Sequence, residues 1–212
     1  MLKYISISIF LFQLINIYEG EAHLRLMFPE SRATRWRFNH SAPVNYDDNQ
    51  CYCGGYSALW YANKGKCGIC GDDYRMETPR PHELHGIYGE GVVVHTYDTE
   101  LLNISTFVTA NHKGYLKFDL CNLDKDGIES EDCFESLHIL EHGDRYMLPK
   151  YMPGWFNTTA IVPNKNFTCE HCVLRMKYIA GNNWGYCKNG EGKLGCGPQE
   201  EFRACADISI VN

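Results

Sequence analysis

Two histidines, His23 and His112, are the residues best placed by sequence to bind a metal. His23 follows Ala22, and cleavage between them would put an α-amino group and an imidazole on one residue. Near neutral pH both groups can act as neutral donors. Held in chelating geometry they suit copper, because imidazole is a good copper ligand and copper(II) stands highest in the divalent affinity order. The sequence therefore predicts a copper site on the first residue of the processed chain.

His112 lies in the segment Thr109-Ala-Asn-His-Lys-Gly114. Ala110 and His112 are two residues apart, so on extended chain they face the same way. A small residue beside a ligand leaves open space at a metal. Taken alone, His112 is better explained as an exposed turn histidine, and the metal hypothesis depends on its combination with His23 and the C-terminal strand.

Glu200 and Phe202 form a second pair with the spacing of one strand face, near the end of the chain. Phe202 could serve as a core aromatic and Glu200 as a solvated edge residue. The pair matters here because it could place a carboxylate and an aromatic ring beside the two histidines.

The first 22 residues have the pattern of a secretory signal peptide. Lys3 precedes a short apolar stretch from Tyr4 to Ile17, and small residues occupy Gly20 and Ala22. The stretch is too short to span a bilayer, and no later segment reads as a membrane helix. We therefore expect a secreted, extracellular protein with a signal peptide over 1–22 and one domain over 23–212.

The composition after residue 22 favours a small disulfide-rich domain without nucleic-acid partners. These 190 residues carry 19 basic and 24 acidic side chains, about −5 in net charge, and contain no basic run. All 11 cysteines lie here, which in a secreted chain indicates up to five disulfides and one thiol left over. Structural zinc is the alternative, since Cys67–Cys70 and Cys169–Cys172 have zinc-ribbon spacing. Four sequons, at Asn39, Asn103, Asn157 and Asn166, predict glycosylation at exposed positions.

Short segments with strand-like patterns predict the β-strands that would position the histidines, Glu200 and Phe202. The expected strands are 91–97, 106–110, 115–120, 172–179 and 202–211, with a turn over 111–114. Residues 202–211 place Phe202, Ala204, Ala206, Ile208 and Ile210 on one face. Short helices are expected only at 56–62 and 131–140. The pattern predicts an all-β fold, a β-sandwich with long disulfide-pinned loops and few short helices.

Several segments, in order, resemble the lytic polysaccharide monooxygenases of auxiliary activity family 15. They include His23-Leu-Arg-Leu-Met-Phe-Pro29, Ser31-Arg32, Trp36-Arg37, Pro43-Val-Asn-Tyr46-Asp-Asp-Asn49, Cys53-Gly-Gly55, Ala110-Asn-His112-Lys-Gly114 and Gln199-Glu-Glu-Phe-Arg-Ala-Cys-Ala-Asp-Ile208. The resemblance covers essentially all of residues 23 to 212.

This resemblance implies an immunoglobulin/fibronectin-III-like sandwich with one copper ion on a flat face. It implies ligation by the amino group and a ring nitrogen of His23 and by a ring nitrogen of His112. Ala110 would sit near one axial position, Phe202 near the other, and Glu200 close behind the ligands. It also implies an external electron donor, with dioxygen or hydrogen peroxide as co-substrate.

The implied partner is an insoluble polysaccharide, chitin before cellulose, attacked by a monomer. Trp36 and Tyr46 are candidate exposed aromatics that would stack on sugar rings, although both could be core residues. Two alternatives stay open: a secreted, non-catalytic copper- or carbohydrate-binding module of the same fold, and a disulfide-rich structural protein without metal.

Overall fold

The structure, a computed structural model, describes residues 23–149 and 152–211. The expected signal peptide over 1–22 lies outside the described residues. Among those described, no helix has the length and apolar character needed to cross a membrane.

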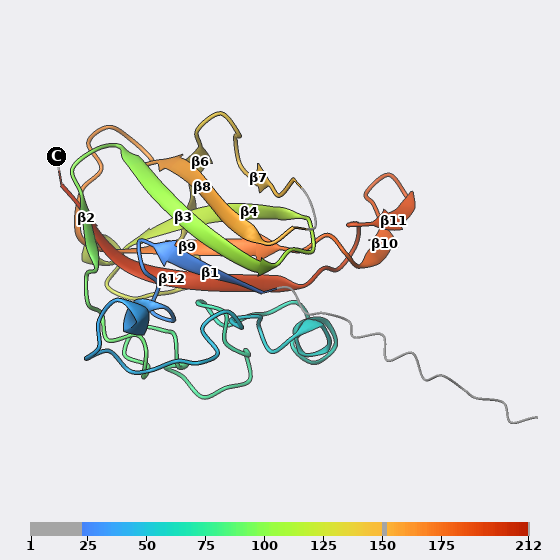
Figure 1. Cartoon of the computed structure of the whole chain (residues 1–212), viewed down its shortest axis with the longest axis horizontal. Coiled ribbons are helices and arrows are strands. Elements are labelled where there is room, and N and C mark those ends of the chain that lie inside the picture. The colour runs from blue at the N-terminus through green and yellow to red at the C-terminus, as the bar shows by residue number, and fades with distance from the viewer. Residues whose placement is uncertain (1–22, 150–151, 212) are drawn as a thin grey trace, which may run out of the picture.

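Two β-sheets pack face to face and form the predicted sandwich (Figure 1). The smaller sheet has the antiparallel order β1-β3-β8-β6, from His23–Phe28, Leu101–Ala110, Gly154–Ile161 and His138–Ile139. The larger sheet has the order β2-β12-β9-β4-β5, from His95–Tyr97, Glu201–Ile210, Cys169–Ile179, Tyr115–Asn122 and Glu135–Ser136, with β7 (Tyr146–Met147) beside β4. A separate hairpin pairs β10 (Trp184–Tyr186) with β11 (Gly192–Leu194).

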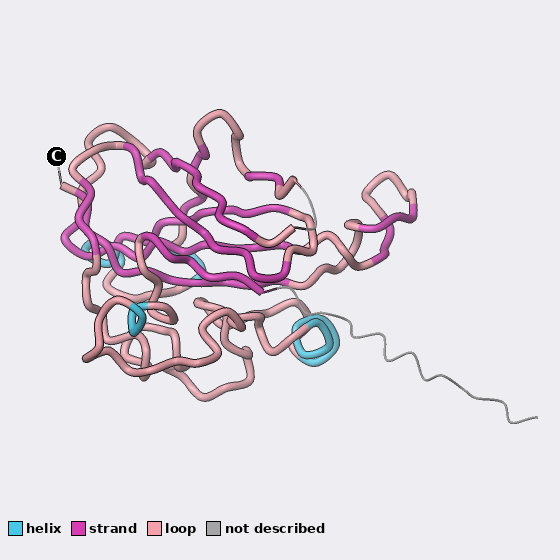
Figure 2. The backbone as a smooth tube through the Cα atoms, in the orientation of Figure 1, coloured by secondary structure: helices cyan, strands magenta, loops and turns pink. Residues whose placement is uncertain are grey.

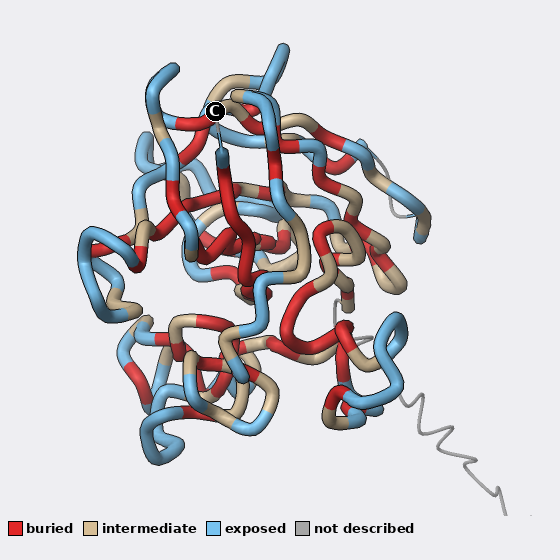
Figure 3. Tube along the Cα trace, turned by 90° about the vertical axis from the view of Figure 1, so that its left-hand side faces the viewer, coloured by how far each residue is buried: buried red, intermediate tan, exposed pale blue. Residues whose placement is uncertain are grey.

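The core lies between the sheets and consists of side chains at alternate strand positions. From β12 it includes Phe202, Ala204, Ala206, Ile208 and Ile210, the face that alternation predicted. Figure 3 shows these buried segments running through the middle of the molecule. This alternation holds because consecutive side chains of a strand point to opposite sides of the sheet.

The residues of β12 that point away from this core are also buried, because a long loop layer covers them. Residues 29–94 contain only two short helical turns, η1 (Arg35–Arg37) and η2 (Ala58–Ala62), and otherwise run as loop (Figure 2). Arg32 crosses from the loop to Asp207 of β12 at 2.7 Å, and the Cys70–Cys205 disulfide joins the same two segments. Charged residues can be buried here because each has a partner.

The remaining elements correct two expectations. Residues 131–140 do not form a helix: after the turn η3 (Glu131–Cys133), strands β5 and β6 follow, with Leu137 and Ile139 buried at the two-residue spacing of a strand. The strand expected over 91–97 is reduced to β2, since Val92 and Val93 are exposed. The strands around the 111–114 turn both form, but β3 and β4 belong to opposite sheets. The short α1 (Leu123–Asp126) follows β4.

Ten cysteines form five disulfides, as the composition predicted. The pairs are Cys53–Cys67, Cys70–Cys205, Cys121–Cys133, Cys169–Cys172 and Cys187–Cys196. All four cysteines with zinc-ribbon spacing are bonded in these disulfides, so the structural-zinc alternative is wrong. Cys51 keeps a free thiol. The four sequon asparagines are all exposed.

Candidate metal centre

His23 is held at one end of the smaller sheet by its pairing with Ala110. The two residues are register partners where β1 runs antiparallel to β3. The Thr109 hydroxyl donates a hydrogen bond to the His23 carbonyl at 3.0 Å. His23, the first residue of β1, therefore lies opposite Ala110, which is two positions before His112 in the sequence.

The turn that carries His112 is fixed by backbone contacts on both sides of the histidine. Its amide donates to the Tyr178 hydroxyl at 3.0 Å, and its carbonyl accepts from the Gly181 amide at 3.0 Å. At Gly114, φ is +79° and a Cβ would lie 1.9 Å from the Ile179 carbonyl oxygen, so only glycine fits. The turn is therefore docked on the end of β9.

Polar atoms behind the His112 ring determine which of its nitrogens can bind a metal. Nδ1 lies 2.9 Å from the side-chain amide of Asn182 and 3.6 Å from Oε2 of Glu200. Asn182 Oδ1 and Glu200 Oε2 are buried acceptors without a hydrogen-bond partner among the described residues. Turning the Asn182 oxygen toward the ring would let Nδ1–H satisfy it, since the two ends of an amide are distinguished by their hydrogen bonds.

With the proton on Nδ1, the lone pair on Nε2 is free for a metal. Metal-bound histidines usually donate their other ring N–H in this way. The orphaned acceptors therefore fit a metal ion such as copper held by Nε2 of His112, and His23 on the adjoining strand has a ring nitrogen that can serve as a second donor.

Phe202 and Ala110 supply apolar surroundings and no ligand atoms. Phe202 is 2% exposed and stacks on Tyr178, with ring centroids 5.6 Å apart. Burial raises the pKa of Tyr178, so its hydroxyl stays neutral where it meets the His112 amide. All five residues singled out from the sequence lie at this end of the sandwich.

Sequence reasoning missed Tyr178, Asn182 and the aromatic surface beside the site. Trp184 and Tyr186 of the β10–β11 hairpin are 58% and 68% exposed. The hairpin projects from the end of the molecule at which β1 starts, and η2 lies at the same end (Figure 1). Gln199 ties these parts together: its carbonyl accepts from the Trp60 indole at 2.7 Å and its side chain accepts from the Asn183 amide at 3.0 Å.

Of the aromatics expected on this surface, Tyr46 is exposed and Trp36 is half-buried against it, at 5.6 Å between rings. Clusters of three or more metal-binding side chains are limited, in the described part of the chain, to Cys70, Glu129 and Cys205, whose cysteines are already bonded to each other.

One family and two solved structures are similar to this chain. A family described as "Lytic polysaccharide mono-oxygenase, cellulose-degrading" matches residues 23–208. A lytic polysaccharide monooxygenase AA15 from Thermobia domestica, solved in the Cu(I) state, is 37% identical with a TM-score of 0.84, over 89% of this chain and 98% of that one. A chitin binding domain from Burkholderia pseudomallei is 11% identical with a TM-score of 0.49, over 90% of this chain and 100% of that one. No curated protein sequence matches.

Proposed function

The chain belongs to the lytic polysaccharide mono-oxygenase family, and we propose that His23 and His112 hold its copper ion and that its substrate is chitin. The observation that carries the proposal is the pairing of His23 with Ala110, which brings the first matched residue beside the turn of His112. Cleavage after Ala22 would add the α-amino group as a third nitrogen donor and would accompany secretion. The match of the family from residue 23 onward supports that boundary.

When bound and reduced by an external electron donor, copper supplies oxidation of a sugar C–H bond by dioxygen or hydrogen peroxide. The protein's own part is to fix the donors and keep side reactions away. Asn182 and Glu200 keep the proton on His112 Nδ1. Ala110 leaves space beside the ligands. Phe202, stacked on Tyr178, adds an apolar ring that cannot coordinate.

The exposed hairpin aromatics fit binding of an insoluble polymer at this end. Trp184 and Tyr186 pack edge to face, 5.0 Å apart, and the Cys187–Cys196 disulfide closes the hairpin behind them. Aromatic rings present large apolar surface at little entropic cost, which suits stacking on pyranose rings. Crystalline chains can lie on such a surface without entering a pocket.

Chitin is proposed from the resemblance to auxiliary activity family 15, and cellulose is the alternative named by the matching family. The test is incubation of the processed, copper-loaded protein with each polymer and ascorbate, followed by mass spectrometry of soluble products. Oxidised oligosaccharides from chitin alone would support the proposal. Products from cellulose alone would overturn the choice of polymer.

His112→Ala tests the metal site, with His138→Ala as the matched control because His138 is an exposed histidine on β6. We expect loss of tight copper binding and of products for the first variant and no change for the second. Tight copper binding by wild type without oxidised products from either polymer would favour the non-catalytic module. Unchanged copper affinity in His112→Ala would overturn the metal assignment.

A further inference from the structure

Cys51 is a free thiol held in the interior between the loop layer and β12. Its carbonyl accepts a hydrogen bond from the Arg203 amide at 2.9 Å, and the residue is 9% exposed. In a chain whose other ten cysteines are bonded, this thiol has a defined environment and no cysteine partner.

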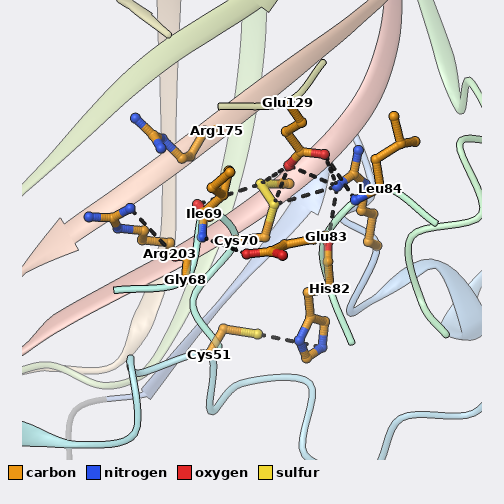
Figure 4. The surroundings of a disulfide bond; sticks show 12 residues. Cys51, Gly68, Ile69, Cys70, His82, Glu83, Leu84, Glu129, Arg175 and Arg203 are labelled. Carbon is orange, nitrogen blue, oxygen red and sulfur yellow. Dashed lines mark hydrogen bonds and ion pairs between the residues drawn. A yellow bond between two sulfur atoms is a disulfide. The ribbon is translucent and has the colours of Figure 1, made fainter. Parts of the chain in front are cut away.

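A histidine and a carboxylate are aligned behind the sulfur. Nε2 of His82 lies 3.7 Å from Cys51 Sγ (Figure 4). The Asp72 carboxylate lies 2.7 Å from Nδ1 of the same ring and accepts a hydrogen bond from the His82 backbone amide at 3.0 Å. Tyr88 stacks on the ring at 4.8 Å. The imidazole is therefore fixed with one nitrogen on the carboxylate and the other on the thiol.

This order of thiol, imidazole and carboxylate is the arrangement that activates a sulfur nucleophile. Burial lowers the pKa of His82, but Cys51 and Asp72 outweigh it and raise the value to about 10. Asn45 completes the surroundings of Nε2, with its amide nitrogen 3.0 Å away.

Access to the sulfur favours a very small reagent. The His82 side chain is 13% exposed, so the edge of the cluster reaches solvent while Asp72 and Asn45 are buried. Because Cys51 is itself buried, a small uncharged reagent suits this site better than a sugar or a peptide. Hydrogen peroxide combines that size with an oxygen–oxygen bond that thiolates attack.

We propose that Cys51 is a peroxide-reactive thiol, with His82 as its acid–base group and Asp72 as the positioning residue. His82 takes the proton from Cys51, and the sulfur attacks one oxygen of hydrogen peroxide. The S–O bond forms as the O–O bond breaks, and the leaving hydroxide takes the proton back from His82. The thiol is oxidised by two electrons to sulfenic acid, and the peroxide is reduced to water. No metal takes part.

The test exposes the full secreted protein, without copper, to hydrogen peroxide for a set time, removes the peroxide with catalase and then unfolds the protein in guanidinium with dimedone, so that the sulfenic-acid trap can reach Cys51. The labelled peptides are measured by mass spectrometry. The compared variants are His82→Gln and, as the matched control, His142→Gln, whose histidine also packs on a tyrosine ring. We expect labelling at Cys51 in wild type and His142→Gln, and a rate about a hundredfold slower in His82→Gln, the low end of the contribution of general acid–base catalysis.

Equal rates in wild type and His82→Gln would overturn the proposal. So would a wild-type rate no faster than that of glutathione at the same pH, because Cys51 would then be an ordinary buried thiol. If His82→Gln does not melt cooperatively, Asp72→Asn and the glutathione comparison decide the matter. Since copper is left out, failure here does not bear on the polysaccharide reaction.

Discussion

Replacing Asn182 with leucine should weaken copper binding without touching a ligand. Leucine keeps the size of the side chain but removes the amide that lies 2.9 Å from His112 Nδ1, and with it the oxygen that would accept from Nδ1–H once the amide is turned. Glu200 stands at 3.6 Å and would have to move to replace it. Loss of such an outer partner costs 10- to 100-fold in metal affinity. The dissociation constant should therefore rise by that factor, about 1.4 to 2.8 kcal/mol.

The assay is competitive copper titration of processed protein, with the copper(II) electron paramagnetic resonance spectrum as a second readout. Asn183→Leu is the matched control, because the neighbouring asparagine has no described contact between its side chain and His112. Its affinity should stay near that of wild type. A change below twofold in a folded Asn182→Leu protein would refute the argument that this residue fixes the proton on Nδ1.

Three further perturbations test the binding surface and the framework. Trp184→Ala should lower retention on insoluble polymer by about 1 kcal/mol, while Trp155→Ala, equally exposed at 58% on β8, should not. Replacing Cys70 and Cys205 by alanine should lower the unfolding free energy in guanidinium by about 4 kcal/mol, since the bond spans 135 residues. Asp119→Asn should cost about 3 kcal/mol at pH 7 by unpairing buried cations. Burial raises the pKa of Asp119, but its cationic neighbours lower it overall, so its contribution is lost as pH falls below about 4 and the cost should shrink there.

The strands that sequence predicted best are those with one face in the core. In β12 the alternation of Phe202, Ala204 and Ala206 identifies the inner face correctly. The burial of Arg203, Cys205 and Asp207 on the other face could not be predicted, because it depends on a loop layer that follows no periodic pattern.

The candidate site shows the same limit. Ala110 and His112 could be singled out because their two-residue spacing puts them on one side of extended chain, and His23 because cleavage after Ala22 would make it the first residue. Asn182 could not, since it reaches His112 only through the packing of β9 against the turn. Trp36 and Tyr46 were candidates for stacking on sugar rings, but nothing in their spacing related them to the two histidines either.

Strand β12 connects the proposed metal centre with the buried charges and the reactive thiol. Its inner face puts Phe202 against Tyr178, whose hydroxyl receives the His112 amide. On the side that faces the loop layer, Asp207 forms an ion pair with Arg32. The Arg203 backbone amide donates a hydrogen bond to the Cys51 carbonyl. Displacement of the strand would therefore disturb the His112 turn and the Cys51 environment together. Arg32 also donates a hydrogen bond to the His82 carbonyl at 3.0 Å, so it contacts the thiol site directly and reaches His112 only through β12. Removing Arg32 should therefore affect thiol reactivity strongly and copper affinity more weakly.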